Sequence, residues 1–170
     1  MRRLQNLLAI TCVMLLAATA NAQLSATTSA TSTANIVAPI TLSKVTDLSF
    51  GNIAASGSIA GTVELTPANN RIASGGATLP VVSGTVSAAT FTATGLSGYT
   101  YAIMLPVDIT LVHSLGLDVM LADNLVSTPS GSGTLTGGSE SIAVGATLNI
   151  EAGQMSGFYS GTFDVSVAYN

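Results

Sequence analysis

Positive charge is scarce in this sequence of 170 residues, which holds four Lys and Arg residues against eight Asp and Glu residues. Arg2 and Arg3 lie at the extreme N-terminus, so Lys44 and Arg71 are the basic residues of the remaining chain. Nucleic-acid binding requires clustered Lys or Arg to neutralise phosphates, and anionic lipid surfaces attract the same side chains. The sequence therefore excludes a nucleic-acid partner and disfavours an anionic membrane surface.

Histidine and cysteine, the usual zinc ligands, occur once each, as His113 and Cys12. A structural zinc site takes about four such ligands, so the sequence argues against one. No carboxylate lies close to His113 in the sequence to mark it as an activated base. We expect His113 to occupy a surface or loop position.

Catalytic motifs are also missing. There is no Gly-x-Ser-x-Gly elbow, and Gly131-Ser132-Gly133 lacks the Lys and the strand–helix setting of a phosphate-binding loop. Asp118 with Asp123, or Glu140 with Glu151, could pair across strands as glycosidase carboxylates, but their spacing does not select them. No Asp-x-Asp run supports a calcium loop. We therefore expect neither an enzyme nor a cofactor.

The N-terminus has the features of an export signal. Arg2 and Arg3 precede an apolar run over residues 7–18, and Ala20-Asn21-Ala22 supplies a small-x-small cleavage pattern. The run is shorter than the roughly twenty apolar residues that span a bilayer. Cleavage after residue 22 would leave 148 residues, without cysteine and with a net charge of −6. We expect a protein that passes through the periplasm to the cell surface or medium, with no disulfide and no membrane span.

Residues 24–43 alternate strictly between two kinds of side chain. The even positions are apolar or small, whereas the odd positions are mostly hydroxyl or amide residues. This period of two is typical of a β-strand with one buried face, but twenty residues exceed the length of one strand. Either the chain crosses between sheets here, or part of the stretch lies outside its own domain and can complete a sheet of another molecule. A Ser/Thr-rich linker is the alternative for residues 23–34, and residues 36–42 could be the first strand of the domain.

The rest of the chain consists of short alternating segments separated by Gly, Pro and Asn, and no stretch has helical periodicity. The segments expected to form strands are 45–50, 59–65, 78–82, 89–94, 99–105, 109–112, 117–121, 134–136, 142–150 and 163–169. This number of strands predicts an all-β fold, a single immunoglobulin-like β-sandwich with an extended N-terminal strand. The predicted organisation is a signal peptide over 1–22, an arm over 23–34 and a sandwich over 35–170.

The C-terminal segment resembles the end of chaperone–usher pilus subunits. Gly157 is the fourteenth residue from the end, Tyr169 is penultimate, and alternating apolar residues lie between them. In those subunits this strand borders a groove, and a periplasmic chaperone pairs with it before an outer-membrane usher assembles the fibre. A glycine leaves room for a neighbouring backbone, and an aromatic residue can anchor the last pair.

A second resemblance covers most of the chain. It rests on Ile36-Val37-Ala38-Pro39-Ile40-Thr41, Asp47-Leu48-Ser49-Phe50-Gly51, Val144-Gly145-Ala146-Thr147-Leu148-Asn149 and the C-terminal segment from Gly157. These runs are similar to the bacterial secreted family catalogued as domain of unknown function 4402. That resemblance implies export and a β fold, and carries no established activity.

Together these observations predict a structural subunit of a fimbria-like surface fibre, in which the arm of one subunit adds a strand to its neighbour. The partners would be copies of the chain or related subunits, with a chaperone and usher implied by the pilus resemblance. The residues expected to bind a partner are Ala26, Ala30, Ala34, Ile36, Gly157, Phe163, Val165, Val167 and Tyr169. The alternative is a monomeric surface module that binds carbohydrate or calcium through its loops.

Overall fold

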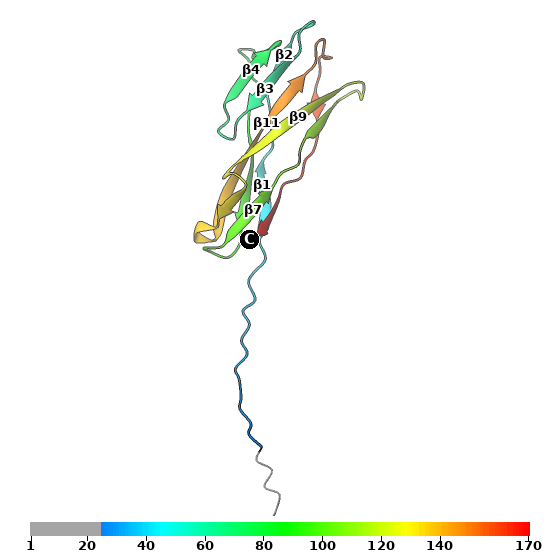
Figure 1. Ribbon diagram of the computed structural model, residues 1–170. Coiled ribbons are helices and arrows are strands. Elements are labelled where there is room, and N and C mark those ends of the chain that lie inside the picture. The colour runs from blue at the N-terminus through cyan, green and yellow to red at the C-terminus, as the bar shows by residue number, and fades with distance from the viewer. Residues whose placement is uncertain (1–24) are drawn as a thin grey trace, which may run out of the picture. The chain divides into compact units, whose positions relative to one another are not determined.

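The computed structural model describes residues 25–170, and its compact part is Ile36–Asn170 (Figure 1). Residues 25–40 form no hydrogen-bonded strand, and the first strand begins at Thr41. Residues 25–43 of the alternating stretch are therefore not one continuous strand, and they do not cross between sheets. The predicted leader, its cleavage site and Leu24 lie outside the described residues.

The main sheet is antiparallel and is built around β11, its longest strand. The order is β1 (Thr41–Thr46), β6 (Ala89–Thr94), β11 (Ser139–Ile150), β9 (Val119–Thr128), β8 (Ile109–His113) and β12 (Tyr159–Ser160). Residues 139–144 of β11 pair with β6, whereas residues 146–150 pair with β3 (Gly61–Leu65), which also pairs with β4 (Arg71–Gly75). One long strand thus joins two local groups of strands.

The remaining strands form smaller sheets. β7 (Thr100–Met104) lies between β10 (Ser132–Thr134) and β13 (Ser166–Tyr169), and β2 (Ala54–Ala55) pairs with β5 (Ala77–Thr78). A 3₁₀ turn, η2, covers Thr136–Gly138. The prediction of an all-β sandwich is confirmed. Among residues 25–170, no helix is long and apolar enough to cross a membrane.

Two clusters of buried side chains hold the strands together, and β11 contributes to both. Ile142 and Val144 belong to one cluster, and Leu148 and Ile150 belong to the other. Because alternate residues of a strand share a face, this run of β-branched and Leu residues places every second side chain in the core. The first cluster also includes Tyr101, Phe91 and Leu135, and the second includes Phe50, Val63 and Leu65.

The buried polar group of Tyr101 is satisfied within this core. Its hydroxyl donates to Glu140 Oε2 at 2.9 Å, and the Thr134 amide donates to the same oxygen at 2.9 Å. Burial, followed by this hydrogen bond and the charge of Glu140, raises the pKa of Tyr101. The phenol therefore remains a neutral donor that joins β7 to β11.

Several strands differ from their predicted bounds. The expected segment 78–82 contains Pro80, which has no amide hydrogen, and the strand ends at Thr78. The segment 71–75 is a strand that the sequence did not indicate, and β9 continues to Thr128, well beyond residue 121. Pairing with β3 explains why Arg71–Gly75 is a strand, because this segment has little apolar alternation of its own.

Candidate functional site

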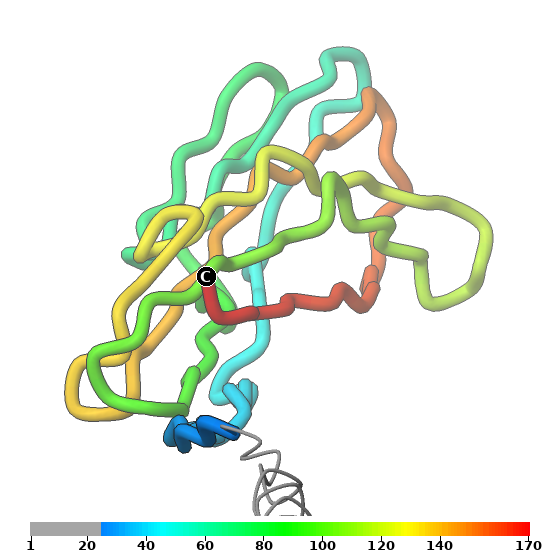
Figure 2. Tube along the Cα trace, turned by 60° about the horizontal axis from the view of Figure 1, so that its bottom comes forward, coloured from blue at the N-terminus to red at the C-terminus, as the bar shows by residue number. Residues whose placement is uncertain are grey.

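The candidate site is a cleft between two sheet edges. β1 ends the main sheet and β13 ends the small one, and within residues 25–170 each pairs on one side only. The two strands approach each other, as the cyan and red segments show in Figure 2. A cleft of about 200 Å³ lies between β1 and the segment 161–163, which leads into β13.

One part of the wall of this cleft is apolar, and the rest is polar or charged. Leu48, Phe91 and Phe163 line it, and the rings of Phe91 and Phe163 meet edge to face with centroids 6.5 Å apart. Lys44 and Asp47 also line it, and they form an exposed ion pair with each other. The apolar part of the wall therefore suits a small or apolar side chain carried by an extended backbone.

The two edges differ in how open they are to another strand. β1 carries Lys44, and its register with β6 shifts between Lys44 and Thr46. A Lys and an irregular register are both features that discourage edge-to-edge pairing. The β13 sequence Ser166-Val167-Ala168-Tyr169 carries no charge, and its register with β7 is regular. An added strand would meet less obstruction at β13 than at β1.

The arm residues predicted to bind a partner are exposed. Ala26, Ala30 and Ala34 are exposed on an extended backbone, and Ile36 is 95% exposed. Packing begins only at Ile40 and Leu42, which contact the core cluster that contains Phe91. The bulky segment 36–42 is therefore divided, because its first residue is exposed and its last residues join the domain.

The predicted C-terminal residues Phe163, Val165 and Val167 are half-buried in their own domain. All three contact the cluster around Phe91, and Phe163 also contacts the cluster around Val63. They therefore stabilise the subunit itself, and Phe163 additionally forms part of the cleft wall.

Tyr169 is held by its own chain. Its hydroxyl accepts a hydrogen bond from the Leu96 amide at 2.8 Å and donates one to the Ala38 carbonyl at 3.2 Å. Its ring meets Tyr99 edge to face, with centroids 5.5 Å apart. The structure thus places the penultimate aromatic residue at the base of the arm.

Gly157 lies against His113, in the loop before β12. A β-carbon at position 157 would collide with the His113 ring, so glycine is required there by a side chain of the same molecule. His113 is 4% exposed, with Nδ1 accepting from the Leu115 amide at 3.1 Å and its ring packed on Tyr159. The expected surface position of His113 is wrong, because the loop containing Gly157 folds over it.

Two of the carboxylates considered for catalysis, Asp118 and Glu140, are bound to neighbouring groups of the fold. Asp118 Oδ2 accepts from Gln154 Nε2 at 2.7 Å, from the Met155 amide at 3.1 Å and from the Tyr159 hydroxyl at 3.1 Å. Hydrogen bonding, led by the Met155 amide, lowers the pKa of Asp118 despite some desolvation. Glu140 is bound to Tyr101 as described above. In the part of the chain that the structure describes, no three His, Cys, Asp or Glu side chains gather as metal ligands would.

Sequence reasoning missed most of the cleft wall. Leu48, Phe91 and Lys44 come from β6 and the β1 region, and only the pairing of distant strands brings them to Phe163. No local pattern marks them as a set.

Comparison with known proteins supports the family resemblance. No curated protein matches the chain. The model of one protein family, described as "Domain of unknown function (DUF4402)", matches residues 40–169, which covers most of the chain and nearly all of its compact part. The chain belongs to this family of proteins of unknown function.

Proposed function

We propose that this protein is a structural subunit of a bacterial surface fibre, in which the N-terminal arm of one copy adds a strand beside β13 of the next. One observation carries the proposal: the chain has both an exposed, alternating arm, extended in Figure 1, and a cleft with an apolar wall at an open sheet edge. β-strand addition joins these two features, since an extended peptide supplies hydrogen bonds to the edge and side chains to the cleft.

The arm would bind mainly through its backbone. Each added ladder hydrogen bond contributes roughly 1 kcal/mol net, whereas small side chains such as those of Ala26, Ala30 and Ala34 bury little apolar surface. Ile36 is the bulky exposed residue on the same face, and its full burial would add roughly 1.5–3 kcal/mol. Ile36 is therefore the side chain that we assign to the apolar cleft of the neighbouring subunit.

The proposal includes the assembly route that the resemblance to chaperone–usher subunits implies. A periplasmic chaperone that paired with β13 would cover this edge before assembly, and an outer-membrane usher would then exchange it for the arm of another subunit. The partners that we propose are copies of this chain or related subunits at the cell surface. The proposed role is structural and not enzymatic.

Deletion of residues 23–34 tests the proposal. We expect the shortened protein to keep its β fold by circular dichroism and its unfolding midpoint, because residues 25–35 are exposed. We also expect it to form no fibres in negative-stain electron microscopy of sheared surface material. Fibres that persist after the deletion would contradict arm-mediated assembly.

A peptide experiment can localise the interaction. A synthetic peptide with the sequence of residues 25–37 should bind the shortened protein and broaden NMR signals of β13 residues. The same peptide with Ala30→Asp is the matched control, and it should bind much more weakly because its charge would face an apolar wall. Equal binding of both peptides would exclude the cleft as the receptor of the arm.

A further inference from the structure

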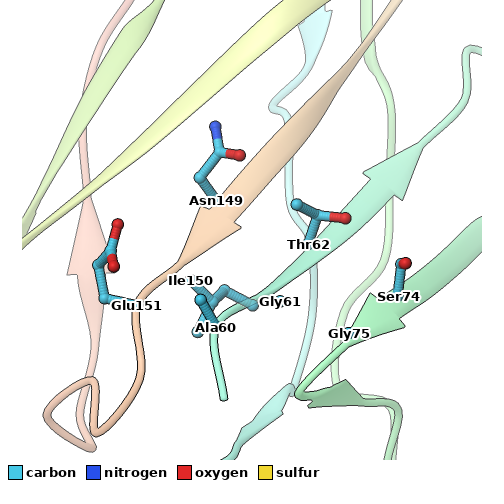
Figure 3. A pocket seen from close by; sticks show the side chains of 8 residues that line it. All are labelled: Ala60, Gly61, Thr62, Ser74, Gly75, Asn149, Ile150 and Glu151. Carbon is cyan, nitrogen blue, oxygen red and sulfur yellow. The ribbon is translucent and has the colours of Figure 1, made fainter.

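A second hollow, of about 310 Å³, lies on the outer face of the main sheet, where β3, β4 and β11 meet (Figure 3). Its lining includes Gly61, Thr62, Ser74, Gly75, Asn149 and Glu151. Its volume is at the lower end of the roughly 300–1,000 Å³ that small-molecule sites occupy. It does not share residues with the cleft beside β13.

The strand register places three polar side chains of this hollow in one row. Thr62 of β3 is directly opposite Ser74 of β4 on one side and Asn149 of β11 on the other. Directly opposed residues have β-carbons about 5 Å apart, so the row presents two hydroxyls and an amide at regular spacing. Glu151 follows β11 beside this row, and Figure 3 shows its carboxylate and Asn149 projecting from the same side of the ribbon.

These polar groups are available for a ligand. Within residues 25–170, the side chains of Thr62, Ser74, Asn149 and Glu151 make no hydrogen bond to the protein; at Glu151 it is the backbone amide that binds Gln154. The hollow is thus different from the clusters at Asp118 and Glu140, whose polar atoms are already bound to neighbouring groups of the protein.

Two glycines in the lining allow neighbouring backbone segments to approach closely. A β-carbon at Gly61 would collide with the backbone of Ala77, and Gly75 has a φ of +64° and lies against the Ala60 carbonyl. Any larger residue at either position would meet this backbone or strain its own. Neither glycine places a side chain over the hollow.

The charge of the lining selects the kind of ligand. No Lys, Arg or His lines the hollow, so a phosphate, sulfate or carboxylate would face Glu151 without a counter-charge. One carboxylate is too few for a calcium site, which takes six to eight oxygen ligands. Two hydroxyls, an amide and a carboxylate can instead donate to and accept from several neutral hydroxyl groups.

We propose that this hollow binds a neutral saccharide. Sugar hydroxyls would donate to the Glu151 carboxylate and to the Asn149 carbonyl oxygen, and would accept from the hydroxyls of Thr62 and Ser74. The sugar ring would lie over Gly61 and Gly75. This binding does not depend on the arm, so the protein would bind saccharide whether or not it forms fibres.

Saturation-transfer difference NMR on the full exported chain tests the proposal, because it observes the sugar and works on monomers and assemblies alike. The probes are the methyl pyranosides of glucose, galactose and mannose, with glucuronate as the anionic comparison. We expect saturation transfer to at least one neutral pyranoside and none to glucuronate. Absence of transfer to all three neutral sugars, or a preference for glucuronate, would overturn the proposal.

Matched variants locate the site. Thr62→Val removes one hydroxyl with little change in shape, and should weaken binding about two- to tenfold. Glu151→Gln should weaken it more than tenfold, because it removes charge-assisted hydrogen bonds. The control is Thr147→Val. Thr147 lies on β11 two residues before Asn149 and on the same face of the strand, but it does not line the hollow. Circular dichroism verifies folding, and an equal loss in Thr147→Val would show that the sugar binds elsewhere.

Discussion

The arm and the C-terminal strand have the same alternating pattern, but only the C-terminal strand is packed into the domain. In the segment 163–169, every second residue is bulky, and these side chains are half-buried against the core clusters. In residues 25–35 the corresponding residues are Ala, Ser and Thr, and they are exposed. Ordering a residue costs roughly 1–2 kcal/mol of backbone entropy, which small side chains offset poorly. Periodicity thus predicts the face of a strand, and side-chain size decides whether the strand packs.

The largest effect is expected on assembly, where the arm would behave as a strand. Ala30→Asp should abolish fibres because its face meets the apolar cleft, whereas Thr31→Asp should be tolerated because successive residues face opposite sides. Fibres are counted by electron microscopy, and both variants should unfold like the parent protein. Equal effects of the two changes would mean that the arm does not bind as a strand.

Phe163→Ala tests how much the packed C-terminal segment stabilises the domain. Phe163 contacts both core clusters, so its truncation should lower the free energy of unfolding by about 2–3 kcal/mol. Phe158→Ala is the matched control, because Phe158 is 71% exposed and its loss should cost less than about 0.5 kcal/mol. Urea unfolding of both variants measures the difference, and similar midpoints would show that the C-terminal strand adds little to the core.

Tyr169→Phe addresses the contact between the C-terminal strand and Ala38, within the compact part of the chain. The change removes the hydroxyl that binds Leu96 and Ala38, and should cost about 1 kcal/mol of stability. Hydrogen exchange at the first residues of β1 should become faster. Tyr99→Phe serves as the control, since the Tyr99 hydroxyl has no hydrogen bond within residues 25–170. Unchanged exchange in Tyr169→Phe would show that the base of the arm is held by other contacts.

The smallest effect concerns acid stability. The pKa of Asp118 is lowered in the folded protein, so its carboxylate stabilises the fold above its ordinary pKa of about 4. This contribution disappears as the pH falls through the lower folded-state pKa. Thermal unfolding from pH 6 to pH 2 should therefore show a smaller acid-induced decline in Asp118→Asn than in the parent protein. Parallel curves for the variant and the parent protein would exclude this contribution. Asp123→Asn is the control, because the Asp123 carboxylate accepts a hydrogen bond from the Asn124 side chain next to it in the chain.

The sequence predicts strands best where bulky alternation and turn residues agree. Ala89–Thr94 has the predicted bounds, and the predicted segment 142–150 lies within β11. Arg71–Gly75 was missed because its pairing with β3, and not its composition, makes it a strand. The role of Gly157 could not be inferred locally, since the group that requires it is a ring 44 positions earlier in the chain.

The candidate sites were less predictable than the strands. Alternation predicted the arm, and the C-terminal resemblance predicted Phe163 as a partner-binding residue. The cleft itself needs Phe91 and Leu48 beside Phe163, and the second hollow needs Ser74, Thr62 and Asn149 in one row. Both sets depend on strand register, which is determined by contacts between distant parts of the chain.

The hydrogen bond between Tyr169 and Ala38 has a mechanical consequence. A fibre held together by arms transmits tension through each arm into the chain at Ile36. Before that tension reaches the β1–β6 hydrogen bonds at Thr41, it meets the bond from the Tyr169 hydroxyl to the Ala38 carbonyl. Tyr169 also belongs to β13, so part of the pull passes directly to β7 and to the Leu96 amide. In the proposed fibre, the penultimate residue would thereby share force between both sheets, and a subunit under load would resist peeling from its N-terminal edge.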